Sequence, residues 1–307
     1  MEFAAAYIKP DFFTDCPDLP RLSSSPGLGI RLAGLHFTLV GLFESEISLL
    51  EERFRGFTYR PAPEDAVEQV IEIREAPSRY FFAPSYPKGE NHVQFDYQLD
   101  QIRLAGSHFY GYFDRNPNTP SNIWVEQGAD HARIEIVENF TRAVLAFRLF
   151  EAGGLLVHSA GIVIDGEALL FLGRSGAGKS TLSGIALEHG TDILSDDLNA
   201  IIPTRGGYGV CRIPFTGDLR HLQSSSSQAL PLRAIFMLSQ HSSTKISAMS
   251  LAQSLQGIMV CSPFVNTDSW RYDQLLESIE RLLASVPCRC LRFTKDGEFL
   301  GLLGNSP

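Results

Sequence analysis

The spacing of apolar residues divides the chain into a strand-rich first part and a mixed second part. Before residue 137, apolar and polar residues alternate or form short apolar runs, which predict β-strands with one or both faces in a core. These strands are expected at 33–39, 70–73, 93–99, 122–125 and 132–136. Residues 45–54 have apolar positions three and four apart and predict a helix. We therefore expect residues 1–136 to form a β-rich α+β domain.

Residues 137–307 combine both patterns and predict an α/β domain. Helices are expected at 139–151, 181–189 and 272–286, and strands at 155–164, 168–172, 192–198, 199–202 and 232–238. Asp165-Gly166 separates two apolar runs and is typical of a tight turn between antiparallel strands. The strand at 168–172 is therefore expected to be the second strand of a hairpin.

One short string occurs twice in the first domain. Residues 30–37 and 102–109 both have the sequence Ile-Arg-Leu-Ala-Gly-x-His-Phe. The repeat indicates two similar strands of one sheet, with coincidence as the alternative. His36 and His108 occupy matching places in it. We interpret both as ordinary strand residues, and a ligand-binding role is the alternative.

Composition and charge narrow the class of protein. A chain of 307 residues with 44% hydrophobic residues can bury a large core in about two domains. A net charge of −9 disfavours nucleic-acid and anionic-membrane partners. We expect no membrane span and no signal peptide, because no long apolar stretch or basic leader is present. The scattered cysteines favour a reducing cytoplasm; they are Cys16, Cys211, Cys261, Cys288 and Cys290.

Cys288 and Cys290 are the one closely spaced pair of cysteines. Two residues at this spacing lie on one face of a strand, which is how we interpret them. A metal site is the alternative, but no second ligand pair accompanies them.

Residues 173–181 fit the phosphate-binding loop pattern of Gly, four residues, Gly-Lys and Ser or Thr. The expected nucleotide-binding residues are Gly173, Arg174, Ser175, Gly176, Ala177, Gly178, Lys179, Ser180 and Thr181. The glycines allow the backbone to wrap closely around phosphate, and the Lys179 ammonium can reach the β- and γ-phosphates. The Ser180 hydroxyl can bind Mg²⁺. The apolar strand before the loop and the helix after it agree with this interpretation, so we expect a nucleoside triphosphate, ATP, to bind here.

Asp196 and Asp197 form the second chemical feature. They follow an apolar strand shortly after the loop, where carboxylates would lie near the γ-phosphate. One can hold Mg²⁺ while the other accepts the proton of an attacking hydroxyl. A solvated turn is the alternative interpretation. His158 is either a structural strand residue or a group that tunes the proton-accepting aspartate.

These segments together resemble a known family. Val157-His158-Ser159-Ala160-Gly161, the Asp-Gly turn, the phosphate loop and Leu-Ser-Asp-Asp are similar to the kinase core of HPr kinase/phosphorylase, which itself resembles ATP-dependent phosphoenolpyruvate carboxykinase. The resemblance is close over 155–200 and extends in outline over 137–307. It implies a P-loop kinase core in which Asp196 is the general base, assisted by His158. Ser180 and Asp197 would then hold the magnesium ion.

The chain also departs from that family. Residues 199–240 contain no Glu, although the family has a later signature segment with a Glu and an Arg-Gly pair. Arg212 and Arg220 are the candidate substitutes for binding acceptor or phosphate. Residues before 137 do not resemble the family's N-terminal domain. We therefore expect a divergent member without the phosphorylase reaction.

The favoured function is a cytoplasmic kinase that transfers the γ-phosphoryl group of ATP, with Mg²⁺, to a Ser or Thr of a peptide or protein. A small-metabolite kinase is the first alternative, and a non-catalytic nucleotide-binding module is the second. Residues 1–136 are expected to select the acceptor, for which an open strand edge could bind an extended peptide. Packing or oligomerisation is the alternative role, and the resemblance implies a homo-oligomer.

Overall fold

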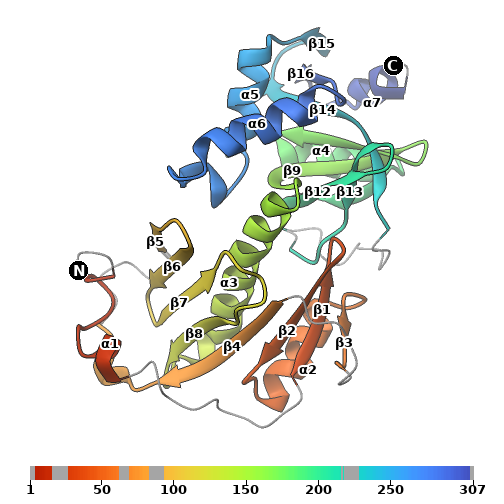
Figure 1. Cartoon of the computed structure of the whole chain (residues 1–307). Helices are drawn as coiled ribbons and strands as arrows, with labels where there is room; N and C mark the ends of the chain where they lie inside the picture. The colour runs from red at the N-terminus through yellow and green to blue at the C-terminus, as the bar shows by residue number, and fades with distance from the viewer. Residues whose placement is uncertain are drawn as a thin grey trace. The chain divides into compact units, whose positions relative to one another are not determined.

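The computed structural model describes residues 4–15, 27–61, 69–82, 93–215, 217 and 228–304. The chain divides into two compact units, Met1–Val144 and Leu145–Pro307 (Figure 1). The division falls inside helix α3 (Asp130–Glu151), so this helix belongs partly to each unit. The boundary expected from the sequence was 136, a little earlier along the same helix.

The first unit is built on an eight-stranded mixed sheet with the order β3-β1-β2-β4-β8-β7-β6-β5. Its strands are β1 (Leu28–Leu32), β2 (Leu35–Val40), β3 (Thr58–Tyr59), β4 (Gln69–Ala76), β5 (Gln94–Tyr97), β6 (Gln101–Gly106), β7 (Phe109–Asp114) and β8 (Ser121–Glu126). The central pairs β2–β4 and β4–β8 are parallel, and the remaining pairs are antiparallel. Its helices are α1 (Phe12–Asp15), α2 (Glu44–Arg53) and the single turn η1 (Ser78–Tyr80).

The strand predicted at 132–136 is wrong, because these residues lie in α3. The buried positions there include Arg133, Ile136, Val137 and Phe140, which have helical spacing. Arg133 is a charged residue, so the hydrophobicity pattern does not mark it as buried. It can be buried because its guanidinium forms ion pairs with Glu46 and Glu75. Arg133 therefore belongs to the buried face of α3.

The repeated string forms two β-hairpins of the same sheet, although the turn falls at different places. In the first copy the turn is Ala33-Gly34, between β1 and β2, and in the second it is Ser107-His108, between β6 and β7. His36 is half-buried in β2, with its ring 6.0 Å from that of Tyr59. His108 has a positive φ of 70° and pairs with Glu126 at 2.6 Å. The two histidines therefore have different, local roles.

The second unit carries a mixed sheet with the order β10-β9-β12-β13-β14-β16-β15, in which β10 also pairs with β14 and β11 pairs with β9. Its strands are β9 (Leu155–Ile164), β10 (Glu167–Leu172), β11 (Asp192–Ser195), β12 (Leu198–Thr204), β13 (Gly207–Cys211), β14 (Leu230–Gln240), β15 (Lys245–Ala248) and β16 (Cys288–Phe293). The predicted hairpin is confirmed, because β9 and β10 are antiparallel and the turn residues Asp165 and Gly166 both have positive φ. β10 is parallel to β14, which is parallel to β16.

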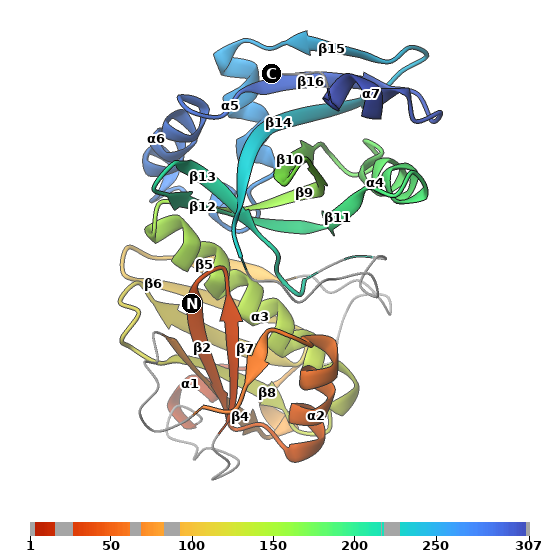
Figure 2. The same cartoon turned by 90° about the vertical axis from the view of Figure 1, so that its right-hand side faces the viewer.

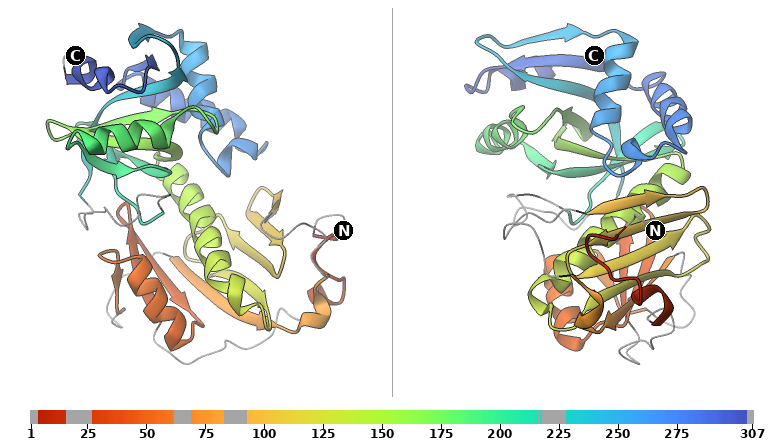
Figure 3. Two further views of the ribbon diagram at one scale, coloured as in Figure 1. Left: turned by 180° about the vertical axis from the view of Figure 1, so that it is seen from behind. Right: turned by 90° about the vertical axis from the view of Figure 1, so that its left-hand side faces the viewer.

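Helices cover both faces of this sheet (Figures 2 and 3). They are α4 (Lys179–Glu188), α5 (Leu251–Val260), the single turn η3 (Val265–Thr267), α6 (Tyr272–Leu283) and α7 (Glu298–Gly304). α4 and α7 lie on one face, where Leu182 and Phe299 join a core with Phe171 and Phe236 of the central strands. α5 and α6 lie on the other face. The predicted helices at 181–189 and 272–286 are confirmed within a few residues.

Candidate functional site

The phosphate-binding sequence forms the connection between β10 and α4, so it lies at the end of a central strand. Gly176 and Gly178 have φ of 79° and 103°, in the left-handed region that favours glycine. A Cβ at Gly173 would lie 2.6 Å from the Cβ of Ala177, and one at Gly178 would lie 2.8 Å from the ring of Phe293. The tight loop therefore requires glycine at three positions: Gly176 because of its conformation, Gly173 because of close packing, and Gly178 for both reasons.

The first turn of α4 presents its backbone to the loop. Gly178 is the N-cap residue, and no side chain caps the helix. Uncapped N–H groups at a helix start are suited to an anion. Lys179 is buried, with 7% of its surface exposed, and its Nζ donates to the carbonyl oxygen of Gly173 at 2.8 Å. Burial lowers the pKa of the Lys179 ammonium.

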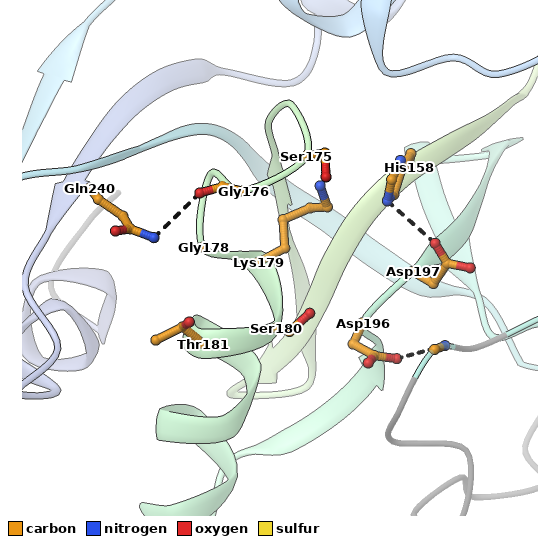
Figure 4. A pocket seen from close by; sticks show the side chains of 11 residues that line it. His158, Ser175, Gly176, Gly178, Lys179, Ser180, Thr181, Asp196, Asp197 and Gln240 are labelled. Carbon is orange, nitrogen blue, oxygen red and sulfur yellow. Dashed lines mark hydrogen bonds and ion pairs between the residues drawn. The ribbon is translucent and has the colours of Figure 1, made fainter.

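A pocket of about 360 Å³ lies beside this loop (Figure 4). It brings together the loop, the two aspartates and the strand histidine that the sequence singled out. The lining residues are His158, Ser175, Gly176, Gly178, Lys179, Ser180, Thr181, Asp196, Asp197, Gly217 and Gln240. The ammonium, hydroxyl and carboxylate groups expected at a phosphoryl-transfer site therefore face one cavity. Arg174 lies in the loop but does not line this pocket.

The sequence predicts one strand over 192–198, but the structure divides it. Asp196 and Asp197 lie in the short link between β11 and β12. Asp196 is buried, with 5% exposed, and its Oδ1 accepts a hydrogen bond from the Gly217 N–H at 3.0 Å. A Cβ at Gly217 would lie 2.9 Å from Asp196 Oδ2, so only glycine permits this approach without a shift. The fixed carboxylate of Asp196 still lines the pocket.

His158 pairs with Asp197 and not with Asp196, to which the family resemblance had assigned it. Its Nε2 lies 3.3 Å from Asp197 Oδ1. The backbone reinforces this pairing, since the Ser159 N–H donates to the Asp197 carbonyl oxygen at 2.9 Å. Burial and then the charge of Lys179 lower the pKa of His158, against the opposing effect of Asp197. The lowered pKa favours the neutral form of His158, whose Nε2 lies beside the Asp197 carboxylate.

Of the two candidate arginines, the structure describes only Arg212, and it does not line the pocket. Arg212 is buried and donates to the carbonyl oxygen of Ile193 and to the Asp192 carboxylate, both at 2.6 Å. It does not line the pocket, and it fixes the strand that leads to the aspartates. Arg220 lies outside the described residues.

Two pocket residues were missed by the sequence interpretation. Gln240, at the end of β14, donates from Nε2 to the carbonyl oxygen of Gly176 at 3.4 Å. The signal for Gln240 was a pair of polar residues, Ser239 and Gln240, at the end of an apolar strand. Gly217 approaches from a segment distant in sequence, and nothing local in the sequence marks it as a neighbour of Asp196.

The pocket supplies oxygen ligands for a metal but no complete protein cage. In the described parts of the chain, no group of three His, Cys, Asp or Glu side chains is placed to hold a metal ion. Ser180 and Asp197 both line the pocket and carry oxygen donors. Mg²⁺ bound with a nucleotide takes most of its ligands from phosphate and water, so this donor set fits it. Cys288 and Cys290 are free, half-buried thiols on β16.

Comparison with known proteins gives one family. The family model described as SynChlorMet cassette protein ScmC matches residues 129–304, more than half of the chain, and the chain belongs to this family. No curated protein matches the chain. Across the described residues, every helix is either too short or too polar to cross a membrane.

Proposed function

We propose that this protein is a kinase of the HPr-kinase-like type that transfers the γ-phosphoryl group of ATP to a hydroxyl. One observation carries the proposal: Lys179 and Ser180 of the phosphate loop line the same pocket as Asp196 and Asp197. A site that only binds nucleotide needs the first pair. The second pair adds a metal ligand and a proton acceptor, which phosphoryl transfer requires.

The loop supplies the binding energy for the phosphates. The uncapped N–H groups at the start of α4 and the left-handed glycines form the cradle. The Lys179 ammonium, which donates to the Gly173 carbonyl oxygen, exchanges that partner for phosphate oxygens when ATP binds. Ser180 and Asp197 would hold Mg²⁺, which would neutralise negative charge on the phosphates.

Asp196 serves as the general base in this proposal. The acceptor hydroxyl oxygen forms a bond to the γ-phosphorus while the bond from that phosphorus to the β,γ-bridging oxygen breaks, and ADP leaves. The hydroxyl proton passes to the Asp196 carboxylate. The hydrogen bond from Gly217 holds this carboxylate in the pocket, and His158 holds Asp197 beside it.

We assign the acceptor to the Ser or Thr class of peptide or protein hydroxyls, and the reaction to the cytoplasm. The described cysteines Cys211, Cys261, Cys288 and Cys290 are free thiols, which suits a reducing compartment.

Replacing Lys179 by Ala tests nucleotide binding. For the wild type, ATP with Mg²⁺ at 100 times the dissociation constant is expected to stabilise the fold by about 2.7 kcal/mol, which raises the melting temperature by about 5–10 °C. Lys179→Ala is expected to lose most of this shift, because the ammonium that reaches the phosphates is gone. Thermal denaturation followed by fluorescence measures both.

Lys245→Ala is the matched control, because Lys245 is an exposed lysine of β15 that does not line the pocket. It is expected to retain the full ATP-dependent shift. A wild-type protein whose melting temperature does not respond to ATP and Mg²⁺ would remove the basis for the proposed function.

A further inference from the structure

A second pocket, of about 210 Å³, includes Arg174 of the phosphate loop in its lining. The helix α5 and the strand β14 form it together with the loop. The residues that matter for its chemistry are Arg174, Met237, Gln256, Gly257, Val260 and Cys261. We call this pocket the α5 groove.

The α5 groove adjoins the end of the first pocket where the aspartates lie. Arg174 in the groove directly precedes Ser175, which lines the first pocket. The backbone carbonyl oxygen of Cys261, which lines the groove, accepts a hydrogen bond from the backbone N–H of His158 at 2.7 Å. In Figure 4, His158 and Gln240 lie on opposite sides of Lys179, and Ser175 lies toward His158. The groove is therefore next to the proposed transfer step and away from the Gln240 end.

The side chains that line the groove include a cation, amides and apolar groups. Arg174 is exposed, and its guanidinium has neither an ion-pair nor a hydrogen-bond partner among the residues that the structure describes. Gln256 is also exposed, and its amide can donate to and accept from a peptide bond. Val260, with 47% exposed, and Met237 supply apolar surface. A cation, an amide and an apolar surface thus line one groove.

The groove is a built feature and not a gap between loosely packed elements. Gly257 lies in the middle of α5, where glycine costs helix stability. A Cβ there would lie 2.8 Å from the sulfur of Met237, so glycine allows α5 to approach β14 closely. The backbone hydrogen bond between Cys261 and His158 fixes the C-terminal end of α5 beside the first pocket.

We infer that the α5 groove binds the acceptor as an acidic peptide, with a carboxylate near the phosphorylated hydroxyl paired with Arg174. This inference rests on the proposed function. The planar guanidinium matches a carboxylate in two parallel hydrogen bonds, which favours Asp or Glu at that position of the peptide. Gln256 bonds the peptide backbone, and Val260 contacts an apolar side chain of the peptide.

The test measures phosphate transfer from γ-labelled ATP with Mg²⁺ to arrayed Ser-centred peptides, in which each flanking position is in turn acidic, neutral or basic. The wild type is expected to prefer peptides with an acidic residue at one or two flanking positions. Gln256→Glu is expected to reduce that preference about tenfold, because the new carboxylate repels the peptide and competes for Arg174. Gln274→Glu, the same change at an exposed position of α6 outside the groove, should leave the preference intact.

The outcomes separate the inference from the proposed function. Peptide phosphorylation without an acidic preference, or with a preference that Gln256→Glu leaves unchanged, overturns the α5 groove as the acceptor site and leaves the kinase in place. ATP-dependent thermal stabilisation with no phosphorylated peptide overturns the peptide acceptor. Absence of that stabilisation overturns the nucleotide site itself, on which both proposals depend.

Discussion

Replacing Asp196 by Asn is expected to lower the turnover of phosphoryl transfer by about 10²–10⁴, the usual contribution of a general base. The side chain keeps its size, and its oxygen can still accept the hydrogen bond from Gly217. The carboxylate that takes the hydroxyl proton is lost, so the chemical step slows while ATP affinity stays nearly unchanged. Single-turnover transfer of labelled phosphate, combined with an ATP titration, separates these two quantities.

Asp197→Asn is the matched comparison, because it makes the same change at the neighbouring position of the link between β11 and β12. Here the expected effect is a higher Mg²⁺ concentration for half-maximal activity, since Asp197 is the proposed metal ligand. If both variants lose ATP binding equally, the division of roles between the two aspartates is wrong.

Replacing Arg133 by Met is expected to destabilise the first unit by about 3–5 kcal/mol. The Arg133 side chain is only 2% exposed and pairs with Glu46 and Glu75. Removing the guanidinium leaves two largely buried carboxylates without their cation. Breaking a buried ion pair in this way destabilises the folded state far more than breaking an exposed ion pair does. The change is large compared with a typical total stability of about 5–15 kcal/mol. Urea unfolding followed by the fluorescence of Trp124 in β8 measures it.

Arg60→Met is the control for that experiment. Arg60 pairs with Glu51 at 3.1 Å, but half of its side chain is exposed. Exposed ion pairs contribute about 0–1 kcal/mol, so this variant is expected to unfold at nearly the wild-type urea concentration. Equal effects of the two substitutions would show that Arg133 does not hold α3 against the sheet through a buried ion-pair network.

The β9–β10 hairpin, the phosphate loop and the helix α4 could be predicted because their sequence signals are local. The Asp165-Gly166 turn, the apolar strand β10 and the glycine-rich loop each depend on residues within a short stretch. The structure places β10, the loop and α4 as expected. Burial of β10 between β9 and β14 explains why its apolar run is continuous.

The failed predictions depend on contacts between distant segments. Residues 132–136 have the alternating pattern of a strand because Arg133 counts as polar. Its burial depends on ion pairs with Glu46 of α2 and Glu75 of β4, which no local pattern reveals. Gly217 and Gln240 reach the pocket from other parts of the chain. The pairing of His158 with Asp197 depends on the register between β9 and β12, which the sequence does not define.

Isothermal titration with ATP, ADP and AMP in the presence of Mg²⁺ tests the central claim most directly. The loop and Lys179 are placed to bind the β- and γ-phosphates, so nucleotides that lack them lose these contacts. The expected result is one saturable site per chain for ATP and ADP, and no measurable binding of AMP at about 1 mM, the upper end of usual substrate affinities. Absence of ATP binding under these conditions, or AMP binding as tight as that of ATP, would contradict the account.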